Sequence, residues 1–256
     1  MVLKVVSNKG WMRYVIAFVS CFVLIKSTWA NDQKLHVVTE QWAPYNYSEN
    51  GSLKGLSVEI VQTIAKKLNV SIDIQLVPSM RAKFMLENNP RTMLITMLRT
   101  AERETKYKWV GPLDDSSIYF YKNKTNPIVI STLEDAKKVH SICSRQGGLV
   151  FSKLKAAGFT NLETSTSEAQ LIYKKLLHNR CDLAISDSPL GVIYLLKQMN
   201  YPPDAITQTA VKLIESPSYF AYSKDIPDTE IARWQKALDR LKASGAFKAI
   251  LRKYNE

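Results

Sequence analysis

The sequence has few cysteines, few histidines and no long apolar run. Its three histidines, His36, His140 and His178, show no ligand spacing with one another or with the cysteines, so we expect no metal and no cofactor. Basic residues outnumber acidic ones, 35 to 23, but they are scattered among acids and form no basic run interleaved with aromatics. The formal charge of +12 therefore indicates solubility and a weak attraction for anions, and nucleic acid is not an expected partner.

The one sizeable apolar run, Tyr14 to Ile25, is too short to span a bilayer as a helix, which takes roughly 20 residues. A basic lead-in comes before it and a small residue, Ala30, follows it at a plausible cleavage point. This order predicts a secretory signal peptide over residues 1–30, cleaved near Ala30. The alternatives are an uncleaved membrane anchor and, on weaker grounds, a lipid anchor at Cys21.

Two cysteines, Cys143 and Cys181, remain beyond that segment. Both lie on expected strands, 139–143 and 181–186, which could be neighbours in one sheet. In an oxidising compartment an even pair can form a disulfide. We expect this bond, and the alternative is two separately buried thiols.

The first half of the chain alternates strand and helix patterns. Residues 36–39 are rich in β-branched side chains and 71–77 alternate apolar with polar positions, which predicts two strands. Apolar residues at helical spacing predict helices over 58–68 and 80–88, and 92–97 reads as another strand. Strand–helix–strand order predicts parallel pairing and an α/β layer structure.

A second α/β block follows a linker-like stretch at Asn123 to Pro127. Its expected elements are a helix over 133–138, a strand over 139–143, helices over 150–157 and 167–178, a strand over 181–186 and a helix over 189–199. The tail predicts two amphipathic helices, the first capped by Asp228 and ended by Gly245. Because no new strand pattern appears after Asp228, we expect the tail to return and cover the first lobe.

One candidate binding group is an arginine at a predicted helix start. Thr100 is a credible N-cap, which places Arg103 in the first turn of the helix. Free backbone amides and a guanidinium together form a strong anion site, and the guanidinium can hold a carboxylate with two parallel bonds. The alternative is that Arg103 merely pairs with Glu102, Glu104 or another surface acid.

Two further candidate segments follow the carboxyl ends of predicted strands, where ligands lie in open α/β sheets. Asp187 follows an apolar strand and could hold an ammonium group, or it could instead stabilise the Ser188-Pro189 turn. Trp42 and Tyr45 lie in a proline-containing loop after the first strand. Their rings could sandwich the apolar part of a ligand and pack against a cation, or they could belong to the core.

These segments, in this order, resemble a known family. The motifs that carry the likeness are Val38–Tyr45, Gly51–Ile60, the Thr-x-x-Arg sequence Thr100–Arg103, Asn179–Asp182 in place of a Gly-Arg-x-Asp pattern, Phe220–Asp225 and Leu241–Gly245. The chain resembles the extracellular solute-binding proteins of family 3, which are the periplasmic amino-acid receptors of bacterial ABC importers. Each motif is weak alone, but together they are specific, and the likeness runs through nearly all of residues 31–256.

The resemblance implies an α/β, two-lobed periplasmic binding protein type II fold. Each lobe would be a mainly parallel sheet flanked by helices, and a two-segment hinge would join the lobes. Lobe 1 would consist of residues 31–122 and 218–256, and lobe 2 of residues 123–217. Two opposite charges on opposing lobes match a zwitterion, and a ligand that bridges both would favour a closed state.

The resemblance also implies which groups contact the ligand. Arg103 would bind its α-carboxylate with help from Thr96, the backbone of Leu98 and a backbone amide at Gly148. Asp187 would bind the α-ammonium, and Trp42 and Tyr45 would flank the side chain. Arg81 and Arg99 add possible charges to the cleft.

Two departures from the family pattern leave the ligand open between an amino acid and another small carboxylate. Asn88–Thr92 replaces a Gly-x-x-Asp turn before the strand that leads to the arginine. Gly147-Gly148 stands where a hydroxyl residue usually follows a glycine, so a side-chain donor is lost.

The function implied is binding without chemistry. A periplasmic monomer would capture a small polar ligand by hinge closure for the membrane permease of an ABC importer. The alternatives are a sensor that feeds a membrane partner, a scavenging protein without an importer, and a dehydratase-like periplasmic enzyme acting on a small carboxylic acid. Glu59, Glu215 and His140 are acid–base candidates by residue type only.

Overall fold

The computed structural model describes residues 34–255, and the described residues from Leu35 onward belong to one compact unit. The predicted signal peptide, residues 1–30, and Cys21 lie outside the described residues. Within the described part, no helix is both long and apolar enough to cross a membrane.

The first of two five-stranded sheets has the strand order β4-β1-β5-β12-β6. Its strands are β1 (His36–Thr39), β4 (Ile74–Leu76), β5 (Thr92–Leu98), β6 (Lys108–Asp115) and β12 (Pro217–Tyr222). Strand β1 pairs in parallel with β4 and β5, whereas β12 runs antiparallel to β5 and β6.

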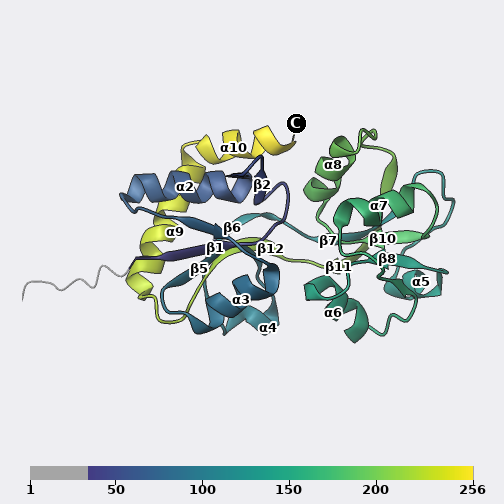
Figure 1. The fold of residues 1–256 in the computed structure, drawn as a ribbon, viewed down its shortest axis with the longest axis horizontal. Coiled ribbons are helices and arrows are strands. Elements are labelled where there is room, and N and C mark those ends of the chain that lie inside the picture. Colours follow the sequence, from purple (N-terminus) through teal and green to yellow (C-terminus); the bar gives the residue numbers. More distant parts are fainter. Residues whose placement is uncertain (1–33, 256) are drawn as a thin grey trace, which may run out of the picture. The chain divides into compact units, whose positions relative to one another are not determined.

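Helices cover both faces of this sheet (Figure 1). One face carries α2 (Leu56–Leu68), α9 (Asp228–Ala243) and α10 (Ala246–Asn255), and the other carries α3 (Ser79–Asn88) and α4 (Ala101–Glu104). Side chains that alternate along β1 divide between the two layers, because Val37 packs with the α2 and α9 cluster and Val38 with the α3 cluster. The expectation that the tail helices cover the first lobe is confirmed.

The second sheet has the order β11-β7-β10-β8-β9. Its strands are β7 (Ile118–Asn123), β8 (Ile142–Ser144), β9 (Leu162–Glu163), β10 (Leu183–Ile185) and β11 (Ile206–Ile214). Helices α5 (Leu133–Lys138) and α6 (Gly148–Ala156) lie on one face, and α7 (Ala169–Leu177) and α8 (Pro189–Gln198) on the other (Figure 1). A two-stranded ribbon, β2 (Tyr47–Glu49) with β3 (Ser52–Lys54), completes the strands of the described residues.

The α/β fold with two helix-flanked, mainly parallel sheets is confirmed. Four of the five strands of each sheet run the same way, and only β12 in the first sheet and β7 in the second run against them. The antiparallel strands are those next to the places where the chain changes sheet, between β6 and β7 at residues 116–117 and between β11 and β12 at residues 215–216. Strand β7 pairs with β10 and β11, so residues 118–122 belong to the second sheet, whereas the lobe bounds implied by the family resemblance placed them in lobe 1. In the linker-like stretch from Asn123 to Pro127, Asn123 is the last residue of β7 and a turn follows at 124–125.

Several predicted element boundaries shift in the structure. The strand expected over 139–143 begins only at Ile142, because Val139 ends α5 as its C-cap. The strand expected over 71–77 is limited to Ile74–Leu76. Asp228 is the first residue of α9 and not its N-cap, which is Pro227. Its carboxylate still lies at the positive end of the helix dipole, and it pairs with Lys108 at 2.6 Å.

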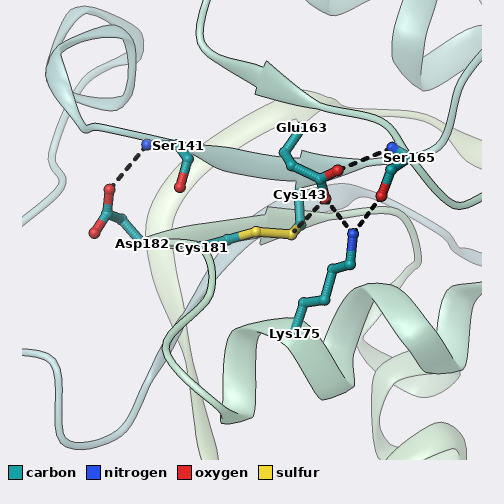
Figure 2. Close-up of a disulfide and its surroundings, with 7 residues drawn as sticks. All are labelled: Ser141, Cys143, Glu163, Ser165, Lys175, Cys181 and Asp182. Carbon is teal, nitrogen blue, oxygen red and sulfur yellow. Dashed lines mark hydrogen bonds and ion pairs between the residues drawn. A yellow bond between two sulfur atoms is a disulfide. The ribbon is translucent and has the colours of Figure 1, made fainter.

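The predicted disulfide between Cys143 and Cys181 is present, with 5.8 Å between the Cα atoms (Figure 2). Cys143 lies in β8, and Cys181 comes just before β10, which pairs in parallel with β8. Beside the bond, Lys175 of α7 donates to Glu163 of β9 at 2.7 Å. Among the described residues, the one cluster with metal-ligand geometry is Cys143, Cys181 and Glu163, and its two sulfurs are bonded to each other.

Candidate functional site

Asp187 is a buried carboxylate just beyond the central strand β10. It is 1% exposed, and its Oδ1 accepts hydrogen bonds from Trp42 Nε1 at 3.1 Å and from Arg145 Nη2 at 3.3 Å. Its Oδ2 is also buried and has no hydrogen-bond partner among the described residues. Burial and then the charge of Asp187 raise the pKa of both Tyr121 and Tyr173. The carboxylate is therefore enclosed, with its partners on one oxygen.

The alternative in which Asp187 stabilises the following turn receives no support from its contacts. Ser188 is the residue that caps α8, because its hydroxyl accepts from Gly191 N at 3.3 Å. Pro189 occupies the first helical position, where a missing N–H costs nothing. The Asp187 side chain is thus left to face Trp42 and Arg145.

Trp42 reaches Asp187 from the loop that follows β1 of the other sheet. The loop closes on itself through bonds from Tyr45 N and Asn46 N to Trp42 O, at 2.9 and 3.0 Å. Gly55 lets α2 approach this loop, since a Cβ at Gly55 would lie 2.3 Å from Tyr45 O, and its φ is +129°. The first amides of α2, Leu56 N and Ser57 N, then donate to the loop carbonyls at 2.9 Å.

Tyr45 is fully buried, and its ring centroid lies 4.7 Å from that of Trp42. Its hydroxyl is 2.7 Å from Ser188 Oγ of the second sheet and 3.4 Å from Ser116 Oγ at the first crossing. Burial, followed by the negative charge of Asp114, raises the pKa of Tyr45. Tyr45 therefore belongs to a hydroxyl network that joins the two sheets, and its contact with a ligand stays a prediction.

Arg103 lies on the short helix α4, beyond the carboxyl end of β5. Its Nη1 donates to Leu98 O at 3.0 Å, and burial lowers its pKa. The nearby acids have other partners, because Glu104 accepts from Arg99 Nε at 2.6 Å and Glu102 accepts from Lys153 of α6. Among residues 34–255 no ion pair to Arg103 is found, so the surface-pair alternative does not describe its contacts. Thr100 precedes α4 as expected, but its hydroxyl makes no capping bond.

Thr96 marks an irregularity in β5. Its φ is +66°, a conformation that a β-branched residue rarely adopts. The pairing with β12 slips at this point, because Met97 lies opposite Tyr219 and Leu94 opposite Ala221, so two residues of β5 face one of β12. This is a β-bulge, and it explains why Met97 packs in the same cluster as Leu94 rather than with Ile95. The Thr96 hydroxyl is buried without a partner in the described residues.

The remaining predicted residues lie in different surroundings. Gly148 is the first residue of α6, with φ +76° and an exposed position. Arg99 pairs with Glu104, and its guanidinium lies 5.0 Å from the ring centre of Tyr219. Arg81 is exposed on α3. Direct contacts thus join Trp42 with Asp187 and Arg103 with Leu98, while Gly148 and Arg81 enter neither set.

Sequence reasoning missed Arg145. It directly follows β8, and its Nε donates to Ser186 Oγ at 2.7 Å in addition to the contact with Asp187. Its place at the carboxyl end of a strand is the same signal that identified Asp187 as a candidate.

A groove of about 490 Å³ lies at the opposite, amino-terminal end of β5 and contains none of the predicted site residues. Its lining includes Glu87, Lys106, Tyr107, Lys224 and Asp225. Both charges occur among these residues, and Tyr107 donates to Glu87 at 2.6 Å.

The three acid–base candidates do not form a group. Glu59 of α2 pairs with Lys253 of α10, and Glu215 pairs with Lys212 at 2.9 Å. His140 is exposed before β8.

Two helix-flanked sheets that the chain crosses twice, with charged groups beyond strand ends on both, define a periplasmic binding protein fold of type II. The model of bacterial extracellular solute-binding proteins, family 3, matches residues 35–256. The chain belongs to this family.

The relatives agree with this assignment. The chain is 24% identical over 237 residues to a probable amino-acid-binding protein, YxeM, of Bacillus subtilis (strain 168), covering 88% of this chain and 84% of the relative. A histidine kinase sensor domain with similarity to periplasmic binding proteins matches with a TM-score of 0.73 and 18% identity, covering 87% of this chain and 97% of that one. The substrate-binding protein of an amino acid ABC transporter matches with a TM-score of 0.67 and 21% identity, covering 85% and 98%.

Proposed function

We propose that this chain is a periplasmic receptor that captures a small polar ligand bearing a carboxylate, either an amino acid or a related small carboxylate. The ligand would lie between the two sheets, and closure about the two crossings would deliver it to the permease of an ABC importer. The proposal includes export by residues 1–30 and action as a monomer. The amino-acid-binding relative and the transporter subunit described above support this role, and the histidine kinase sensor domain supports a sensor as the alternative.

The observation that carries the proposal is the hydrogen bond from Trp42 to Asp187, 3.1 Å long. The two residues follow strands of different sheets, and both were expected at a ligand site from their positions at strand ends. This hydrogen bond links the two lobes, so it forms only when the lobes are close together. A ligand that contacts both lobes would favour the same closed arrangement.

Arg103 is the proposed carboxylate-binding group. Burial makes an unpaired guanidinium costly, so a ligand anion beside it would be strongly favoured. The acids on either side of it in the sequence, Glu102 and Glu104, are engaged with Lys153 and Arg99, and no ion pair to Arg103 is found in the described residues, which leaves its remaining N–H groups for a ligand.

Isothermal titration calorimetry with a panel of amino acids and small carboxylates tests this function. We expect at least one to bind, and the change Arg103→Gln to weaken that binding by about 2–5 kcal/mol. Arg252→Gln, on the exposed surface of α10, is the matched control and should bind as the unchanged protein does. The absence of any ligand in the panel would overturn the proposal. Conversion of a bound ligand into product, followed by NMR, would favour the enzyme instead.

A further inference from the structure

Two opposite charges meet at the end of β10, and they differ in their access to solvent. The side chain of Asp187 is 2% exposed, whereas that of Arg145 is 34% exposed, with Nη2 3.3 Å from Asp187 Oδ1. Trp42 closes over the same oxygen from the other sheet. A molecule that approaches this point therefore meets the guanidinium before it meets the carboxylate.

Arg145 already provides a positive charge beside the buried carboxylate of Asp187. A buried carboxylate without a counter-charge is costly, because the surrounding protein cannot replace its hydration. Arg145 supplies that charge from the same lobe, and Ser186 fixes the guanidinium through its Nε at 2.7 Å. Both partners occupy Oδ1, so a ligand ammonium would have to reach the buried Oδ2, and the positive charge of Arg145 would oppose its approach.

The same guanidinium has N–H groups left for an anion. Of its five donors, one is used by Ser186 and one by Asp187, and no bond to its Nη1 occurs among residues 34–255. Helix α6 begins three residues after Arg145, at Gly148. Its Lys153 pairs with Glu102, the residue before Arg103. The Lys153–Glu102 pair therefore joins α6, which follows Arg145, to α4, which carries Arg103. The two arginines thus belong to neighbouring segments of the two lobes.

We propose that Arg145 is a specificity-determining residue that takes the place of a ligand ammonium at Asp187, so that the preferred ligand is a small carboxylate without an α-amino group. This inference rests on the proposed receptor function and narrows its ligand class. Arg103 and Arg145 then both act toward an anion, and Asp187 holds Arg145 in position rather than touching the ligand.

Calorimetry on ligand pairs that differ only in the amino group tests the inference. Suitable pairs are glutarate with L-glutamate, succinate with L-aspartate, and 4-methylpentanoate with L-leucine. We expect the acid without the amine to bind about tenfold more tightly in any pair that binds, since it avoids repulsion from Arg145. A preference of tenfold or more for the amine-bearing member would overturn the inference and leave the receptor function intact. If neither member of any pair binds, the inference fails, whereas the receptor function fails only if the wider panel of amino acids and small carboxylates also contains no ligand.

The substitution Arg145→Met removes the guanidinium and keeps an unbranched side chain. It should shift the preference within a pair toward the amine-bearing member by at least about tenfold, because Asp187 then lacks a cation. Arg252→Met should leave the preference unchanged, and an unchanged preference in Arg145→Met would contradict the inference. Arg145→Lys, which keeps the charge but not the guanidinium geometry, should retain the preference for the deaminated acid. The wild-type pairs decide the question even if Arg145→Met does not fold.

Discussion

Thr96 and Thr39 are both buried threonines with a hydroxyl that lacks a partner within residues 34–255, but their backbone conformations differ. Both are nearly or fully buried, and the hydroxyl of each has no hydrogen-bond partner among the described residues. Thr39 ends β1, and only Thr96 has a positive φ, +66°. A left-handed conformation costs an L-residue roughly 1–2 kcal/mol and costs glycine nothing comparable. The β-bulge at Thr96 therefore stores strain at a position predicted to line the ligand site.

Replacement of each threonine by glycine separates the strain from the loss of the side chain. Both changes remove the same buried atoms, but only Thr96→Gly relieves an unfavourable φ. We expect Thr96→Gly to have a free energy of unfolding about 1–2 kcal/mol higher than that of Thr39→Gly, measured by urea denaturation. Equal stability of the two variants would show that the bulge imposes no strain on Thr96.

At the scale of elements, the disulfide links β8 to the residue just before β10, and the far ends of these two strands carry the Arg145–Asp187 ion pair. Cys143 lies two residues before Arg145, and Cys181 lies six residues before Asp187. The bond therefore acts on the same two strands, β8 and β10, that position the guanidinium against the carboxylate.

Removing this bond should destabilise the fold. The bonded residues are separated by 38 positions, so the cross-link restricts a sizeable loop of the unfolded chain. The double change Cys143→Ala and Cys181→Ala should lower the free energy of unfolding by about 2–4 kcal/mol in guanidinium denaturation. Reduction of the unchanged protein should lower its stability by a similar amount. An unchanged unfolding midpoint in both experiments would mean that the strands hold their arrangement without the bond.

Over the whole molecule, the two sheets are joined by more than the two chain crossings. Three of the four crossing residues, Ser116, Ser117 and Ser216, are buried serines, and Ser216 Oγ at the second crossing donates to Arg99 O at 2.7 Å. Side-chain contacts between residues of the two sheets and their helices include Tyr45 with Ser188, Trp42 with Asp187, and Glu102 with Lys153.

The Glu102–Lys153 pair predicts a pH-dependent contribution to stability. The hydrogen bond from Lys153 lowers the pKa of Glu102 to about 2, below the usual glutamate value of about 4.3. A lowered folded-state pKa means that the contribution is present above pH 4.3 and is lost as the pH falls toward 2. The melting temperature of the unchanged protein should therefore exceed that of Glu102→Gln at pH 7.

The difference in melting temperature between the unchanged protein and Glu102→Gln should shrink below about pH 4.3, where Glu102 of the unfolded chain becomes protonated. It should also shrink in high salt, because the Glu102–Lys153 pair is partly exposed. Circular dichroism melts from pH 7 to pH 3 measure it. Glu134→Gln is the control, because Glu134 pairs with Lys137 of the same helix, α5, and that pair does not join the two lobes. A difference that grows as the pH falls would contradict the assignment of the pair.

Much of the secondary structure was predictable, because apolar spacing reports directly which face of a segment is buried. The helices α5 and α2 and the strand β1 follow their patterns closely. Strands β6, β7, β11 and β12 were not predicted. Gly111-Pro112 lies inside β6 and reads as a turn, but β6 is an edge strand, where a proline is tolerated.

The sequence by itself determined the alternating α/β order, the family motifs and the residues that follow strand ends, because these depend on local spacing and residue type. Only the tertiary structure decided that β7 belongs to the second sheet, that the Tyr45 hydroxyl meets Ser188, and that Arg145 pairs with Asp187. Those outcomes depend on strand pairing and register between residues far apart in the chain. Local periodicity predicts that a strand exists, but it does not specify its neighbour.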